Sequence, residues 1–102
     1  MRLASPMARV ITQNASMAQL QLDSGERILI SLTRKEIGFF KLGFFGFIPM
    51  YQIWGGSIDD YNRGPYKPAS FTMFALNPVR YLIEDLSQFR SIEEMQKRLS
   101  SK

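Results

Sequence analysis

The sequence predicts an α+β domain: an antiparallel sheet or small open barrel of about five strands (two hairpins plus a later strand), followed by one or two C-terminal helices packed on it. Between residues 17 and 33 apolar and polar residues alternate, which is the period of a half-buried strand. From Asn77 onward apolar residues recur every three or four positions, which is the period of an amphipathic helix. With 102 residues the chain can bury one modest core. We expect residues 1–6 to form a disordered N-terminus and residues 7–102 to form a single α+β domain.

The first predicted hairpin spans residues 17–33. Leucines alternate with glutamines in residues 17–23, and aliphatic residues occupy alternate positions in residues 27–33. Between them, Gly25 lies in a polar stretch and can adopt the positive φ that tight turns require. Before this hairpin, residues 7–12 are compatible with a short strand or with an extended arm.

The second predicted hairpin is rich in aromatic residues. Residues 37–42 and 47–54 have the aromatic and aliphatic composition of strands, and they flank residues 43–46, which have a glycine at each end. Pro49 has no amide proton to donate to a neighbouring strand. It therefore predicts that the second strand of this hairpin lies at a sheet edge or contains a bulge.

A loop and one further strand follow in the predicted order of elements. Residues 55–68 contain three glycines and two prolines, so we expect them to form the main loop of the domain. Residues 70–76 are apolar at nearly every position, which is typical of a strand that is covered on both faces or paired centrally.

The C-terminal quarter carries two helix-start signals. Asn77 is a suitable N-cap, and Pro78 suits the first helical position, where no amide donor is needed. Ser91 and Glu94 have the spacing of a capping box, which predicts a second short helix, and residues 87–90 are read as a kink or a break between the two. The predicted core comprises Leu20, Leu22, Ile28, Ile30, Leu32, Phe47, Ile53, Phe71, Met73, Val79, Leu82, Ile83 and Leu86.

Composition excludes several classes of function. The chain has no Cys and no His, which removes disulfides, thiolate nucleophiles, Ser-His-Asp triads and metal sites built on imidazole or thiolate. Its net charge of +4 permits an anionic partner without requiring one. No apolar stretch of signal-peptide length follows the N-terminal Met, and the apolar run of residues 37–54 is too short and too interrupted to span a bilayer. We therefore expect a cytoplasmic protein without a transmembrane segment.

Two groups of residues are weak candidates for catalysis or metal binding. Asp59, Asp60 and Asn62 resemble the start of a calcium loop, but the twelfth position is Phe71, where a bidentate Glu belongs. A buried Lys41 would suit catalysis, yet a lysine with its ammonium in solvent is the commoner case. We expect no enzymatic activity, no metal site and no cofactor.

The aromatic residues of the second hairpin favour a binding function. In an extended chain, adjacent rings such as those of residues 39–40 and 44–45 must point to opposite faces, so a small domain with eight Phe, four Tyr and one Trp has difficulty burying all of them. The leading hypothesis is a small non-enzymatic protein-interaction or assembly module that uses residues 37–54 to bind a protein partner or a second copy. The alternative without any binding function is that the C-terminal helices cover these rings. The candidate surface comprises Phe39, Phe40, Lys41, Phe44, Phe45, Tyr51 and Trp54.

A nucleic-acid partner is the alternative hypothesis. Bases can stack on exposed rings beside cations, and Arg27, Arg34, Lys35 and Lys41 lie in or near the aromatic segment. Residues 45–50 overlap part of an RNA-recognition signature, but the basic residue and the final aromatic residue are missing. So few cations make a thin phosphate-binding track, and we expect no nucleic-acid binding above background. Contact with a membrane surface is left open.

Overall fold

The chain folds as an open five-stranded antiparallel sheet followed by helices, which confirms the predicted α+β class. The computed structural model describes residues 8–43, 48–63 and 77–100. Each strand pairs with the next one along the chain, so the sheet order equals the sequence order. The strands are β1 (Ala8–Gln13), β2 (Met17–Leu22), β3 (Arg27–Leu32), β4 (Glu36–Leu42) and β5 (Pro49–Ser57), and the helices are α1 (Ile58–Arg63), α3 (Pro78–Leu86) and α4 (Ile92–Ser100).

Both predicted hairpins form, as β2–β3 and as β4–β5, and the described sheet has one more strand. It is β1, the segment for which the sequence left a strand and an extended arm open. The predicted strand at residues 70–76 lies outside the described residues, as does the expected disordered stretch at residues 1–6.

The prediction of a loop across residues 55–68 is wrong for its described part. Strand β5 continues to Ser57, and α1 begins directly after it. The Asp60 amide donates to Ser57 Oγ at 2.9 Å, and the Ser57 amide donates to Asp60 Oδ2 at 3.3 Å. This reciprocal pair is a capping box, so the serine-to-aspartate spacing outweighs the preceding glycines as a local signal.

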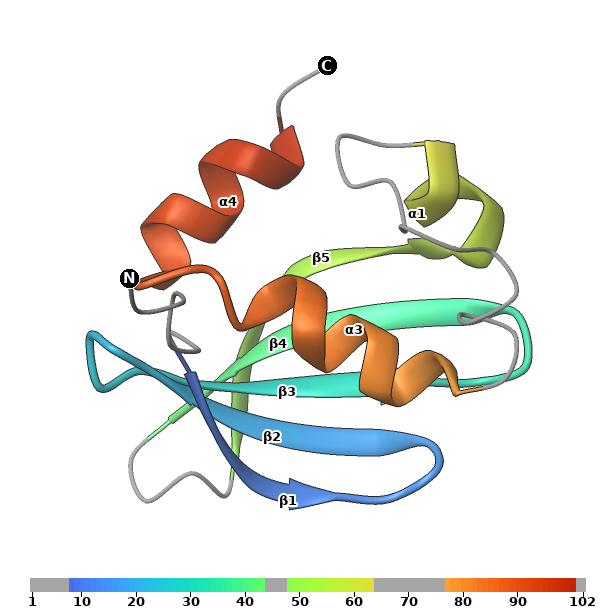
Figure 1. The fold of residues 1–102 in the computed structure, drawn as a ribbon. Coiled ribbons are helices and arrows are strands. Elements are labelled where there is room, and N and C mark those ends of the chain that lie inside the picture. Colours follow the sequence, from blue (N-terminus) through green and yellow to red (C-terminus); the bar gives the residue numbers. More distant parts are fainter. Residues whose placement is uncertain (1–7, 44–47, 64–76, 101–102) are drawn as a thin grey trace, which may run out of the picture.

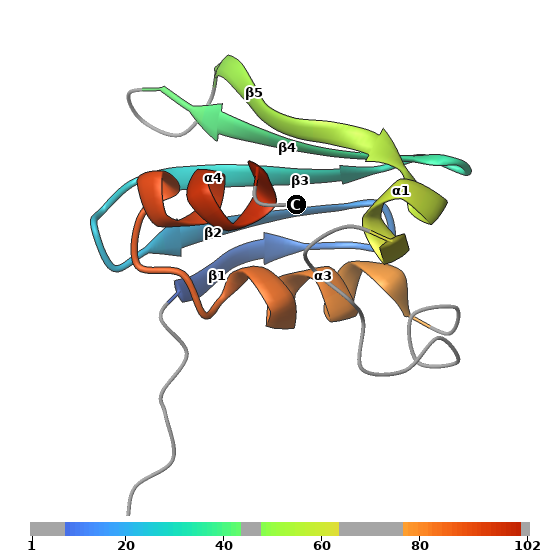
Figure 2. The same ribbon diagram turned by 90° about the horizontal axis from the view of Figure 1, so that it is seen from above.

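The helices and the sheet enclose one core. Figures 1 and 2 show α3 running along the β1 side of the sheet and α1 at the far end of β5. Helix α4 packs against β5. Helix α3 packs against β1, β2 and β3, whereas α1 packs against β4 and β5. Buried side chains of all three helices join those of the sheet in a single cluster. This cluster defines the covered face of the sheet, and the opposite side is called the outer face below.

Most of the predicted core residues that the structure describes are buried. Leu32 and Ile53 are only partly buried and pack against the margin of the core. Leu32 ends its strand, and Ile53 sits in the strand at the sheet edge. Phe47, Phe71 and Met73 lie outside the described residues. The fully buried members are Leu20, Leu22, Ile28, Ile30, Val79, Leu82, Ile83 and Leu86.

The starts of α3 and α4 are capped as the sequence predicts. Asn77 Oδ1 accepts a hydrogen bond from the Arg80 amide at 3.3 Å, with Pro78 in the first turn. Ser91 Oγ accepts from the Glu94 amide at 3.2 Å. The Glu94 carboxylate reaches back one residue further than in a standard capping box and accepts from the Arg90 amide at 2.8 Å. Residues 87–90 form a real break between the two helices.

The turn between β2 and β3 is tied to the start of α4 through Glu26. Its Oε1 accepts hydrogen bonds from the Ile92 amide at 2.9 Å and from Ser24 Oγ at 2.7 Å, and its Oε2 lies 3.7 Å from Lys41 Nζ. The Ser24 amide also donates to the Arg90 carbonyl at 2.9 Å. Burial opposes ionisation of Glu26, but the two hydrogen bonds and the Lys41 ammonium outweigh it and lower the pKa of the carboxyl. The carboxylate therefore acts as a long-range cap of α4.

A second polar contact joins α1 to α3 beside a cluster of aromatic rings. The hydroxyl of Tyr61, whose side chain is buried, donates to Asp85 Oδ2 at 2.8 Å. The Tyr61 ring meets those of Phe39 and Trp54 edge-on, with centroids 6.0 and 5.6 Å away. Burial of the Asp85 carboxyl raises its pKa, the Tyr61 hydroxyl lowers it in part, and the neighbouring Glu84 raises it further.

Asp85→Asn is expected to stabilise the protein slightly at neutral pH. The amide oxygen can still accept the Tyr61 hydrogen bond, while the desolvated charge and its repulsion from Glu84 are removed. We expect a gain of less than about 1 kcal/mol, because solvent partly screens the group. A raised pKa means that the folded state holds this proton more tightly than the unfolded state. The variant's advantage in urea denaturation should therefore grow from pH 3 to pH 7, and an advantage that shrinks over this range would contradict the assignment.

Candidate interaction surface

Strand β5 forms one edge of the described sheet. Seven residues of β4 lie opposite nine residues of β5, so β5 carries two extra residues. The register shifts place them at Met50, between the partners of Lys41 and Leu42, and at Ile53. The prediction from Pro49 is thus confirmed in both of its forms, because β5 is an edge strand of the described sheet and it is bulged.

Three large apolar side chains are exposed where β5 begins. Relative exposure is 69% for Ile48, 60% for Met50 and 44% for Tyr51. We call these three residues the hairpin-end surface. The other exposed large apolar side chains among the described residues are Val10 and Met17, at 43% each, on strands β1 and β2. The strongest apolar exposure of the described chain is thus at the end of the β4–β5 hairpin.

The structure separates the aromatic residues that the sequence grouped together. Phe39 is fully buried in the core, so it contributes nothing to a surface. Its neighbour Phe40 lies on the outer face and is half-buried, as expected for adjacent strand residues. Trp54 is half-buried, with its ring centroid 5.6 Å from that of Phe39. Tyr51 is exposed, while Phe44 and Phe45 lie outside the described residues.

Ile48 and Met50 are absent from the surface predicted from the sequence. The predicted surface was chosen for its aromatic rings and Lys41, and in a regular strand alternate residues would face the core. The bulge at Met50 breaks this alternation. Pro49 was the available signal, because a proline in a strand marks a place where regular pairing fails.

The four cations proposed for nucleic acid do not form a continuous track. Arg34 and Lys35 lie in the turn between β3 and β4, at the opposite end of the sheet from Arg27 and Lys41. Lys41 lies opposite Ile28 on the covered face and pairs with Glu26.

The carboxylates considered for catalysis lie far from Lys41. Asp59 and Asp60 occupy the first turn of α1. This helix follows the C-terminal end of β5, which pairs with the start of β4. Lys41 is near the other end of β4. Within residues 8–43, 48–63 and 77–100, no three His, Cys, Asp or Glu side chains gather closely enough to hold a metal ion.

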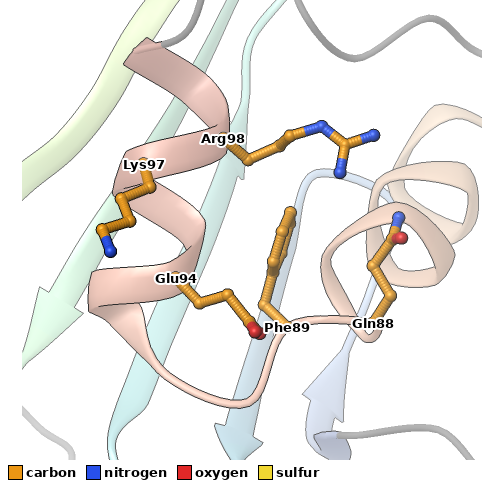
Figure 3. A pocket seen from close by; sticks show the side chains of 5 residues that line it. All are labelled: Gln88, Phe89, Glu94, Lys97 and Arg98. Atoms are coloured by element: carbon orange, nitrogen blue, oxygen red, sulfur yellow. The ribbon is translucent and has the colours of Figure 1, made fainter.

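A groove of about 370 Å³ lies between the C-terminal end of α3 and helix α4. Its floor is the buried ring of Phe89. Figure 3 shows Arg98 reaching across this ring toward Gln88, with Glu94 below it and Lys97 pointing to the other side of α4. The rim carries both acidic and basic side chains, and all of them are exposed. The groove is therefore shallow and polar at its rim.

Comparisons of this chain with protein-family models, with curated proteins and with solved structures find no match. Among the described helices, none has the length and apolar character needed to cross a membrane.

Proposed function

We propose that this protein is a small non-enzymatic protein-interaction or assembly module that binds a second copy of itself through the hairpin-end surface. The observation that carries the proposal is the exposure of Ile48, Met50 and Tyr51 next to an edge strand. Adjacent exposed apolar side chains of this size are typical of interaction sites.

The distribution of charge allows a second copy to bind at this edge. The molecule carries a net charge of +4, so two copies repel each other over most of their surfaces. Strand β5 has no charged residue in nine positions. Two copies can therefore meet at this edge without placing like charges together, and a two-fold axis would bring the same apolar side chains into contact.

Side-chain packing is the expected mode of contact, and strand addition is not. Pro49 lacks an amide proton, and the two bulges interrupt the regular row of backbone donors and acceptors along β5. Such features protect an edge from pairing with further strands. The exposed side chains of the hairpin-end surface remain able to pack against a second copy.

The dispersal of polar groups supports a non-enzymatic role. Lys41 and the carboxylates of α1 lie at opposite ends of β4. A general acid–base mechanism needs such groups within hydrogen-bond reach of one substrate. Lys41 is also engaged by Glu26.

Sedimentation velocity of the wild type and of an Ile48→Glu/Met50→Glu variant tests the proposal. We expect concentration-dependent dimers of the wild type and at least a tenfold weaker association of the variant, on the order expected for truncating an interface hot spot. Val10→Glu/Met17→Glu is the matched control, because it also places two glutamates at exposed apolar positions and makes the same charge change. The control should dimerise like the wild type.

Circular dichroism and thermal unfolding establish that each variant remains folded. A wild type that stays monomeric at its highest soluble concentration would refute self-assembly. Equal loss of dimers in both variants would refute the assignment to the hairpin-end surface.

A further inference from the structure

Strand register brings two arginines and a glutamine together on the outer face of the sheet. Arg9 of β1 lies opposite Gln21 of β2, and Gln21 lies opposite Arg27 of β3. The next residues along the strands, Leu22 and Ile28, are buried in the core, so the side chains of this row point to the other face. The three side chains are therefore neighbours in one row across three strands.

The side chain of Arg9 reaches across the sheet toward Arg27. Its Nη2 donates to Gln21 Oε1 at 3.0 Å, which holds the guanidinium over β2. Two strand spacings separate the backbones of Arg9 and Arg27, roughly 10 Å. Arginine side chains are long enough for both guanidiniums to meet a single group above Gln21.

This pair of cations has no counter-ion in the described part of the chain. Arg27 is half-buried, and neither it nor Arg9 forms an ion pair with a described carboxylate. Glu26 is adjacent to Arg27, but its carboxylate is held by Ile92, Ser24 and Lys41. Two like charges in one row repel each other, and an anion bound between them relieves that repulsion.

We propose that Arg9, Gln21 and Arg27 form a binding site for one phosphate group of a phosphomonoester. The planar guanidinium matches the oxygen geometry of phosphate and can donate two parallel hydrogen bonds to it. A phosphomonoester approaches a charge of −2 at neutral pH, which balances two guanidiniums. Two cations suit one phosphate group and are too few for the backbone track of a nucleic acid.

This site is separate from the hairpin-end surface and goes beyond the proposed assembly function. The phosphate group could belong to a soluble metabolite or to a lipid such as phosphatidic acid. Both sources present the same dianion to the arginines. The experiment therefore has one arm for each source.

Calorimetric titration with phenyl phosphate is the soluble arm, and cosedimentation with phosphatidylcholine vesicles, with or without phosphatidic acid, is the lipid arm. We expect saturable binding in at least one arm. Arg9→Gln and Arg27→Gln should each weaken it about tenfold, which is the loss expected for charge-assisted hydrogen bonds. Arg34→Gln is the control, because it removes the same charge from an exposed arginine at the opposite end of the sheet.

Binding of phenyl phosphate assigns the site to soluble ligands, and binding only to vesicles that contain phosphatidic acid assigns it to lipid. Arg27→Lys should bind at an intermediate level, because it keeps the charge and loses the guanidinium fork. Absence of saturable binding in both arms would overturn the proposal. Equal weakening by Arg34→Gln would also overturn it, because attraction to net charge alone would then explain the binding. The Ile48→Glu/Met50→Glu variant should keep its phosphate affinity, so the assembly proposal can fail independently.

Discussion

Phe39→Ala is expected to lower the free energy of unfolding by about 3–5 kcal/mol, a large part of the roughly 5–15 kcal/mol that stabilises a typical domain. The Phe39 side chain is fully buried and packs against the rings of Trp54 and Tyr61. Its removal leaves a cavity where the sheet meets α1. Urea denaturation monitored by circular dichroism gives the midpoint and the slope from which the free energy of unfolding is obtained.

Phe40→Ala is the matched control for this prediction. It makes the same truncation one residue along the same strand, but on the outer face, where the ring is only half-buried. We expect a cost of about 1–2 kcal/mol, in proportion to the smaller area buried. Equal costs for the two variants would contradict the assignment of faces. If Phe39→Ala does not fold, Phe39→Leu should fold, because a smaller change in core volume is better tolerated.

Glu26→Ala is expected to cost about 1–3 kcal/mol. The change removes hydrogen bonds to the Ile92 amide and to Ser24 Oγ, together with the contact to Lys41. Hydrogen bonds to a charged group exceed neutral ones in strength, and partial exposure of Glu26 limits the total. Glu36→Ala, at an exposed glutamate next to a turn, should change stability by no more than about 0.5 kcal/mol.

The effect of Glu26 should depend on pH in one direction. Its pKa is lower in the folded protein than the ordinary value of 4.5, so the folded state holds this proton less tightly than the unfolded state. The stabilisation is then fully present above pH 4.5 and is lost as the pH falls through the lower, folded value. The stability difference between the wild type and Glu26→Gln should therefore shrink from pH 7 to pH 3. A difference that grows in acid would show that the carboxylate does not cap α4.

Local sequence patterns determined the two hairpins and the starts of α3 and α4. Alternation of apolar residues is a property of the strand itself, and Asn77 and Ser91 act on amides three residues away. The sequence signal for the start of α1 was also local, because Ser57 and Asp60 cap each other. It was missed because the flanking glycines were given more weight.

Only the tertiary structure decided which aromatic rings are buried and which polar groups meet. The pattern shows that Phe39 and Phe40 face opposite ways, but the packing of Tyr61 from α1 selects Phe39 for the core. The contact between Glu26 and Ile92 joins residues 66 positions apart. The row of Arg9, Gln21 and Arg27 depends on the register of three strands, which is set by burial of the opposite face. A one-residue slip would move all three side chains to the other face, and no short stretch of sequence contains that information.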